Sequence, residues 1–244
     1  MNYKLTISYD GSRYKGWQRL GDTDMTIQQK IENVLFEMFF EPVELHGSGR
    51  TDAGVHSIGQ VANFSVDKDV APKEIKEYLY RYLPDDIVVT SVKKVDERFH
   101  ARLNASEKTY VYKIYNDFYH NPFLRKQVLH VQENLDLEAM KKAAQYFIGE
   151  YDFSAYTSAK SKKKSNVRKI DSIEILKAGH EIDISIIGNG FLHNMARKIV
   201  GTLLEVGLGN MKATEVPGII SSKDRANTGT MAPARGLYLF KVKY

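Results

Sequence analysis

An α+β fold with two ferredoxin-like (RRM-like) halves is the fold class that this 244-residue sequence predicts. Three observations support it. Strand-like and helix-like segments alternate along the chain, residues 1–100 follow the order β-α-β-β-α-β, and the second half repeats that order. The repeat is one of element order and not of residue identity. A boundary is expected at residues 102–106, which gives an N-terminal half at 1–104 and a C-terminal half at 105–244.

The first half begins with a strand, because apolar and polar residues alternate from Tyr3 to Tyr9. Thr26 and Gln29 have the spacing of a capping box, and apolar residues then recur at helical spacing up to Phe39. Strands are expected at residues 43–46 and 60–66, on either side of a glycine-rich loop. A helix at 71–82 and a strand at 87–94 complete this half.

The second half opens with a strand at residues 110–114, followed by a helix at 136–148. Strands are expected at 170–176 and 182–186. Apolar residues from Leu192 to Leu203 then line one face of a helix. A short helix near 213–221 precedes a final strand at 237–243.

The composition, 43% hydrophobic and 27% charged, is typical of a soluble globular protein. No apolar run approaches the roughly 18 residues of a membrane span and the first residues do not form a signal peptide, so we expect a cytoplasmic protein without membrane contact. The absence of cysteine excludes thiolate catalysis and Cys-ligated zinc. The histidine spacing gives a metal site little support, and we expect neither metal nor cofactor. A net charge of +5 favours an anionic partner only weakly.

The most informative stretch is residues 47–56, which places one carboxylate, Asp52, among three glycines and two positions after Arg50. Glycines let a substrate approach the main chain, and the arginine favours an ionised carboxylate that can act as nucleophile or base. A tight turn with a surface ion pair is the alternative, and these ten residues leave both open. The loop lacks the glycine spacing of a dinucleotide fingerprint, and no P-loop sequence occurs in the chain.

Three further segments contain candidate residues. Residues 99–102 precede a strand opening at Tyr110, which is either core material or a ring that stacks on a base with its hydroxyl near a substrate proton. Arg197 lies opposite the apolar stripe of its helix, and is either solvated or pressed against a cleft. A basic run without interleaved carboxylates is either a solvated loop or a phosphate contact; it comprises Lys160, Lys162, Lys163, Lys164, Arg168 and Lys169.

These segments together resemble the tRNA pseudouridine synthase A (TruA) family, and the matches run in order through nearly the whole chain. The most specific is Gly-Arg-Thr-Asp-Ala-Gly-Val-His at residues 49–56. The others lie at 9–11, 16–18, 59–61, 99–102, 108–110, 167–168, 191–195 with Arg197, 232–234 and 236–239. Ser48 replaces a frequent alanine, Met231 replaces a usual threonine, and residues 160–165 are unusually basic. None of these departures touches the residues to which the resemblance assigns catalysis.

The resemblance implies a continuous, mostly antiparallel sheet flanked by helices, with the active-site cleft between the halves. It implies isomerisation of uridine to pseudouridine at positions 38 to 40 of the tRNA anticodon stem-loop, by a homodimer whose subunits share one tRNA. Asp52 would be the catalytic nucleophile, Arg197 its ion-pair partner, and Tyr110 would stack on the target uracil. Arg50 would order the loop or contact the RNA. Further RNA contacts are expected from Arg168, Lys162, Lys163 and Lys164.

Several alternatives stay open at this level. The carboxylate could attack the sugar, attack the base, or take the ribose C2′ proton on a glycal route. A non-catalytic RNA-binding protein on the same duplicated fold is a rival interpretation, but the chain has no aromatic RNP-type run. A hydrolase with an aspartate nucleophile is a third, but no second carboxylate is placed to activate water. The sequence therefore favours the synthase.

Overall fold

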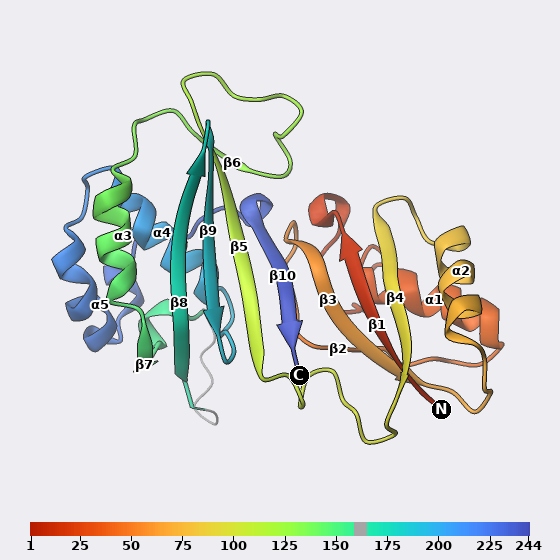
Figure 1. The fold of residues 1–244 in the computed structure, drawn as a ribbon. Helices are drawn as coiled ribbons and strands as arrows, with labels where there is room; N and C mark the ends of the chain where they lie inside the picture. The colour runs from red at the N-terminus through yellow and green to blue at the C-terminus, as the bar shows by residue number, and fades with distance from the viewer. Residues whose placement is uncertain (159–164) are drawn as a thin grey trace. The chain divides into compact units, whose positions relative to one another are not determined.

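The structure, a computed structural model, describes residues 1–158 and 165–244. These residues form two compact units, Met1–Ser106 with Tyr238–Tyr244, and Glu107–Leu237. Across the described residues, five α-helices flank strands that pair mostly antiparallel (Figure 1). The predicted α+β class is therefore confirmed.

The first unit contains the element order β-α-β-β-α-β. Its elements are β1 (Asn2–Tyr9), α1 (Ile27–Phe39), β2 (His46–Gly47), β3 (His56–Ser65), α2 (Pro72–Tyr82) and β4 (Ile87–Val95), joined by β10 (Leu237–Lys243). The strand order is β4-β1-β3-β10, with β2 paired to β3. β1 pairs antiparallel with both β3 and β4, whereas β10 runs parallel to β3. The last strand of the chain thus extends the sheet of the first unit.

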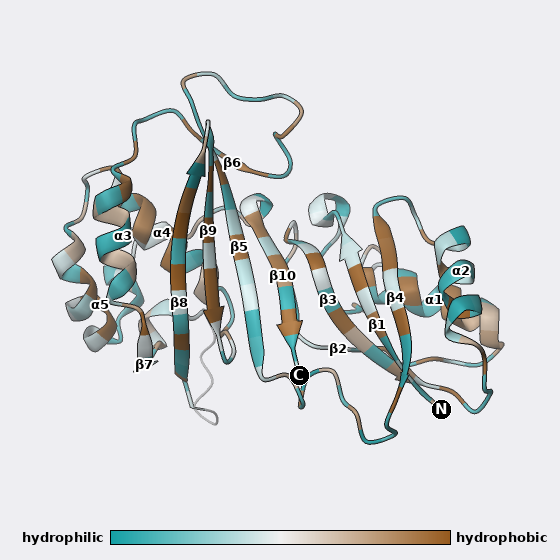
Figure 2. Cartoon of the chain, viewed as in Figure 1, coloured by the Kyte–Doolittle hydropathy of each residue, from teal (hydrophilic) through white to brown (hydrophobic). Residues whose placement is uncertain are grey.

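The core of this unit follows from the alternation seen in the sequence. Tyr3, Leu5 and Ile7 are fully buried on one face of β1, and apolar residues of α1 and α2 pack against them. Brown and teal residues alternate accordingly along the strands in Figure 2. Thr26 caps α1 by accepting a hydrogen bond from Gln29 N at 3.3 Å, but the Gln29 side chain does not reach back. Only half of the expected capping box forms.

The second unit also combines an antiparallel sheet with α-helices. Its elements are β5 (Glu107–Asn116), β6 (Leu129–Val131), α3 (Leu137–Gln145), β7 (Gly149–Asp152), β8 (Val167–Ala178), β9 (Glu181–Gly188), α4 (Met195–Gly207) and α5 (Val216–Ser222). The strand order is β5-β9-β8-β7, all antiparallel, with β6 added parallel to β5. In Figure 1, α3, α4 and α5 lie together beside β8.

Several elements differ from the sequence expectation, each for a local reason. The strand expected at 43–46 shrinks to His46–Gly47, because two residues are all that pair with β3. β6 and β7 are too short to produce an alternation signal. Leu192 precedes α4 and is not part of it, since Asn194 adopts a left-handed conformation (φ 64°) at the N-cap. The short helix near 213–221 is a one-turn 3₁₀ helix followed by α5.

Candidate functional site

The loop that carries Asp52 connects β2 to β3 and is tied to β3 at its base. Ser48 N donates to Val61 O at 2.7 Å, and Ser48 Oγ donates to Gln60 Oε1 at 2.7 Å. The amide of Gln60 in turn donates to Gly49 O at 2.8 Å. Because Gln60 and Ser48 are both fully buried, these bonds are shielded from water and fix where the loop leaves the sheet.

The tip of the loop is fixed by main-chain contacts on both sides of the aspartate. Thr51 O accepts from Trp17 N at 3.0 Å, and the Thr51 hydroxyl lies 2.8 Å from Tyr9 OH. On the other side, Val55 N donates to Asp52 O at 3.1 Å and closes a turn. The half-buried Asp52 is therefore presented from a backbone with little freedom, while Arg50 is exposed on the same loop.

Two glycines of the N-terminal matched segments lie directly beneath this loop. A Cβ at Gly11 would stand 1.9 Å from Val55 O, and one at Gly16 would stand 2.6 Å from Thr51 O. Gly16 also has a φ of +104°, which L side chains rarely adopt. Residues 9–18 thus form the floor of the Asp52 loop. Their match to a family pattern is visible in the sequence, but their physical task becomes visible only in the structure.

Tyr110 and Arg168 border one segment of the second unit. The ring of Tyr110, which is 8% exposed on β5, meets Phe191 edge-on with centroids 4.9 Å apart. The backbone of Asn189 pairs with Lys169, the residue after Arg168, through Asn189 N and Lys169 O at 3.0 Å. Arg168 donates to Ser165 O at 3.0 Å, and partial burial lowers the pKa of its guanidinium. The structure therefore brings these two candidates to residues 189–191.

Arg197, in the first turn of α4, is half-buried and bound to a distant segment. Its Nε donates to Ala232 O at 2.7 Å, and Ala232 N donates back to Arg197 O at 3.1 Å. Nη1 lies 3.4 Å from Asn194 Oδ1, at the N-cap of the same helix. Arg197 is thus oriented by the matched segment at residues 232–234, and a purely solvated arginine is the wrong interpretation.

Tyr112 is a residue of this region to which the sequence assigned no role. It is fully buried two positions after Tyr110 on β5, and its hydroxyl donates to Pro233 O at 2.8 Å. Burial raises the pKa of Tyr112, while the charges of Arg197 and Arg235 oppose that rise. The sequence did contain a signal for Tyr112: side chains two positions apart on a strand lie on the same face, so Tyr112 shares the face of Tyr110.

The candidate residues fall into two groups. Asp52 and Arg50 belong to the first unit, and Tyr110, Arg168 and Arg197 belong to the second. The ion pair between Asp52 and Arg197 stays a prediction. Lys162, Lys163 and Lys164 lie outside the described residues.

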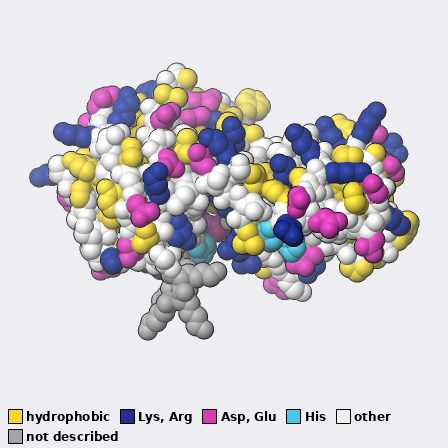
Figure 3. Space-filling model, turned by 60° about the horizontal axis from the view of Figure 1, so that its bottom comes forward, with side chains coloured by type: hydrophobic (Ala, Val, Ile, Leu, Met, Phe, Trp, Pro, Cys, Tyr) yellow, Lys and Arg dark blue, Asp and Glu magenta, His cyan; other side chains and the backbone are white. Residues whose placement is uncertain are grey.

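Three further observations concern the described residues. In the described ranges, no group of three or more His, Cys, Asp or Glu side chains is arranged to hold a metal ion. No helix there has the length and apolar character needed to cross a membrane. On the face seen in Figure 3, basic and acidic side chains are interspersed. What the described groups supply is one carboxylate on a fixed loop, and arginine and aromatic side chains held by regular elements.

Comparison with known proteins gives a consistent match. The family model described as tRNA pseudouridine synthase matches residues 5–104 and 143–244. The chain is 56% identical over 243 residues to tRNA pseudouridine synthase A of Bacillus sp. (strain KSM-64), covering 100% of this chain and 99% of that protein. It is 51% identical, with the same coverage, to tRNA pseudouridine synthase A 2 of Bacillus anthracis. A solved chain in the crystal structure of a Cbf5-Nop10-Gar1 complex matches at 16% identity and a TM-score of 0.36, over 83% of this chain and 45% of that one.

Proposed function

Since the chain belongs to the tRNA pseudouridine synthase family, whose members are isomerases, we propose that it converts uridine to pseudouridine at positions 38 to 40 of the tRNA anticodon stem-loop. Asp52 is the proposed nucleophile. The observation that supports it most is the loop at residues 48–55, in which main-chain bonds on both sides of Asp52 fix the backbone that presents its carboxylate. Rigid presentation of the reacting group is what a catalytic site requires.

The proposed reaction breaks the N1–C1′ glycosidic bond, turns the uracil, and joins C5 to C1′, with loss of the C5 proton and gain of a proton at N1. No electron and no phosphoryl group is transferred. Asp52 serves by attacking the sugar or the base, or by removing the C2′ proton on a glycal route. In each route an ionised carboxylate is the reactive species.

The second unit supplies binding and charge in this proposal. Tyr110, set edge-on against Phe191, stacks on the target uracil, and its hydroxyl assists removal of the C5 proton. Arg197, held by Ala232 O, pairs with Asp52 and offsets the cost of burying that carboxylate. Arg50 and Arg168 contact the RNA.

The proposed substrate adds an energetic demand. A uridine in a stem-loop must be flipped out of its stack, at a cost of roughly a few kcal/mol that phosphate contacts offset. Lys162, Lys163 and Lys164 are the proposed source of such contacts. A cytoplasmic homodimer whose subunits share one tRNA completes the proposal.

Tritium release from tRNA that carries ³H at C5 of its uracil bases tests the function, because only substitution at C5 liberates that label. The wild-type protein is expected to release tritium without added cofactor, and Asp52→Asn is expected to release none. Tight tRNA binding without tritium release by the wild type would favour the rival of a non-catalytic RNA-binding protein.

A further inference from the structure

The turn at residues 96–104 has no part in the proposed chemistry, although it contains the matched Phe-His-Ala-Arg segment. Its backbone is held firmly. Asn104 Oδ1 accepts from His100 N at 2.7 Å, and Asn104 N donates to His100 O at 3.0 Å. Ala101 N donates to Asn63 Oδ1 of β3 at 2.8 Å. His100 and Arg102, which flank Ala101, are therefore presented from a rigid support.

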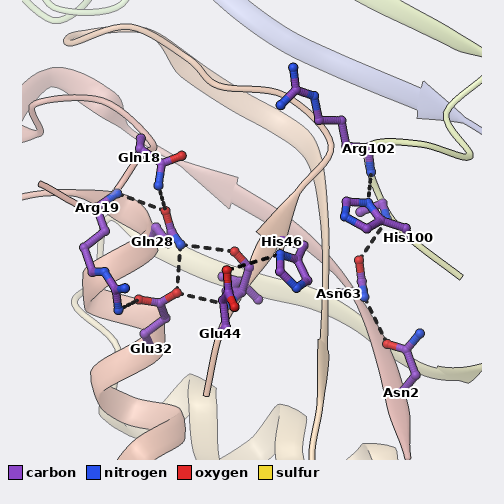
Figure 4. Close-up of polar contacts among 12 residues, drawn as sticks. Asn2, Gln18, Arg19, Gln28, Glu32, Glu44, His46, Asn63, His100 and Arg102 are labelled. Carbon is purple, nitrogen blue, oxygen red and sulfur yellow. Dashed lines mark hydrogen bonds and ion pairs between the residues drawn. The ribbon is translucent and has the colours of Figure 1, made fainter. Parts of the chain in front are cut away.

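A second histidine, His46 of β2, lies against the first. The two imidazole rings stack with centroids 5.0 Å apart and an interplanar angle of 23°. Both residues are labelled in Figure 4. Pairing of β2 with β3 places His46 opposite Asn63, the same residue that holds Ala101. The buried Asn63 thus holds Ala101 through its side chain and lies opposite His46 in the strand register, which brings the two histidine-bearing segments together.

The hydrogen-bond pattern assigns the tautomer of His100. Arg102 N donates to His100 Nδ1 at 3.1 Å, so this nitrogen is an acceptor. A neutral ring must then carry its proton on Nε2, which is a donor. No other hydrogen bond reaches this ring from the described residues.

The side chains at this site can donate hydrogen bonds to an anion. The Arg102 side chain is exposed, and in Figure 4 its guanidinium extends away from the turn. Glu44 Oε1 lies 3.7 Å from His46 Nδ1, beyond hydrogen-bond distance, and is 74% exposed, so it is a weak competitor. A phosphate oxygen is the acceptor best matched to guanidinium and imidazole donors.

We propose that His46, His100 and Arg102 form a binding site for a phosphodiester of the RNA backbone, separate from the contacts of the reacting uridine. The site rests on the proposed function, which supplies the RNA. It gives the first unit a further RNA contact, besides the one proposed for Arg50, built from groups that the proposed chemistry leaves unused.

The salt dependence of tRNA binding tests the site. In the double variant His100→Gln/Arg102→Gln, the plot of log affinity against log salt is expected to flatten by roughly 0.7 to 0.9 units, the change that corresponds to one bound phosphate. His180→Gln is the matched control, because His180 Nδ1 also lies 3.7 Å from a carboxylate, Asp117, but outside the cluster. An unchanged slope in a double variant that melts like the wild type overturns the site. If the double variant melts at a lower temperature than the wild type, Arg102→Gln alone replaces it in the same salt titration, because Arg102 is exposed.

Inorganic phosphate distinguishes the source of the ligand. Phosphate alone can shift the ring proton NMR signals of His46 and His100 while the salt slope of tRNA binding stays unchanged in the double variant. In that case the site binds a small phosphate ligand, and the assignment to RNA is wrong. A flattened tRNA slope supports it. The two proposals fail separately: wild-type protein that releases no tritium refutes the uridine chemistry, whereas the slope difference reports on the phosphate site alone.

Discussion

The two units hold their candidate residues by different means. Asp52 sits on a loop whose main chain is bonded on both sides and rests on two glycines. Tyr110 and Arg197 instead project from a strand and a helix and are held by side-chain contacts, with Phe191 and Ala232. A loop packed through its backbone tolerates no added atoms beneath it, whereas a side chain on a regular element can change without moving the backbone. We therefore expect substitutions beneath the Asp52 loop to damage the fold, and those in the second unit to damage activity first.

The largest effect is expected at Asp52 itself, where a substitution should remove the chemistry and leave the fold intact. Asp52→Asn and Asp52→Ala should abolish tritium release, because the proposed nucleophile is gone. The affinity for tRNA should stay within about tenfold of wild type, or ~1.4 kcal/mol. Residual turnover above about one per cent of wild type, measured at saturating tRNA, would remove Asp52 from the role of nucleophile.

Gly11→Ala tests the backbone-held side of the comparison. The new Cβ would stand 1.9 Å from Val55 O, so the loop must shift, and we expect a loss of unfolding free energy near the upper end of ~1–3 kcal/mol. Gly21→Ala is the matched control, since nothing lies within 4 Å of its Cβ. Urea denaturation of both variants gives the comparison. Equal stability of the two would show that the loop has room beneath it.

Arg197 tests the second unit, in which side-chain contacts hold the candidate residues. Arg197→Met removes the charge that the proposal pairs with Asp52, and should lower kcat/KM by roughly 10- to 150-fold, the ~1.5–3 kcal/mol of a hydrogen bond between charged groups. Arg197→Lys keeps the charge without the planar donor and should fall between Met and wild type. Arg197→Met also loses the bond to Ala232 O, so its urea midpoint should fall modestly, while the loss of turnover should be the larger effect. A large loss of stability with normal turnover would make Arg197 a structural residue.

Tyr110 separates stacking from proton transfer. If the ring only stacks, Tyr110→Phe keeps most activity and Tyr110→Leu loses about 1–3 kcal/mol of transition-state or substrate binding. If the hydroxyl acts on the C5 proton, both variants lose turnover. Single-turnover tritium release measures each. Full activity of the leucine variant would return Tyr110 to the role of a core residue.

The smallest effect is expected from the basic run. Replacing Lys162, Lys163 and Lys164 together by alanine should weaken tRNA binding and flatten the salt plot by roughly 0.7 to 0.9 units for each phosphate that the variant no longer binds. A titration of affinity against salt measures this change. An unchanged slope would identify these lysines as a solvated loop.

Regular elements and the reactive loop could be predicted, because their signals are local. Alternation marked β1, helical spacing marked α1, and the glycine spacing around Asp52 marked the loop. These properties depend only on residues close together in the chain, which is why the expected element types agree with the structure.

Long-range contacts could not be predicted in the same way. No local signal states that Val55 O lies above Gly11, that Ala232 O orients Arg197, or that Tyr112 reaches Pro233. The parallel pairing of β10 with β3 could not be predicted for the same reason, because alternation within a strand does not indicate which strand pairs with it.

The pairing of β10 with β3 has a consequence for how the chain is made. Ser57 Oγ of β3 donates to Leu239 O of β10, 182 residues later, and His56 stacks on Tyr238. At synthesis rates of about 5 to 20 residues per second, the ribosome needs roughly 10 to 35 s to cover that separation. During that time the part of β3 at His56 and Ser57 lacks the partner that β10 supplies, and an unpaired strand edge is a template for pairing with other chains. We therefore expect a nascent or truncated chain without residues 238–244 to leave this end of β3, beside the loop of Asp52, open to pairing with other chains.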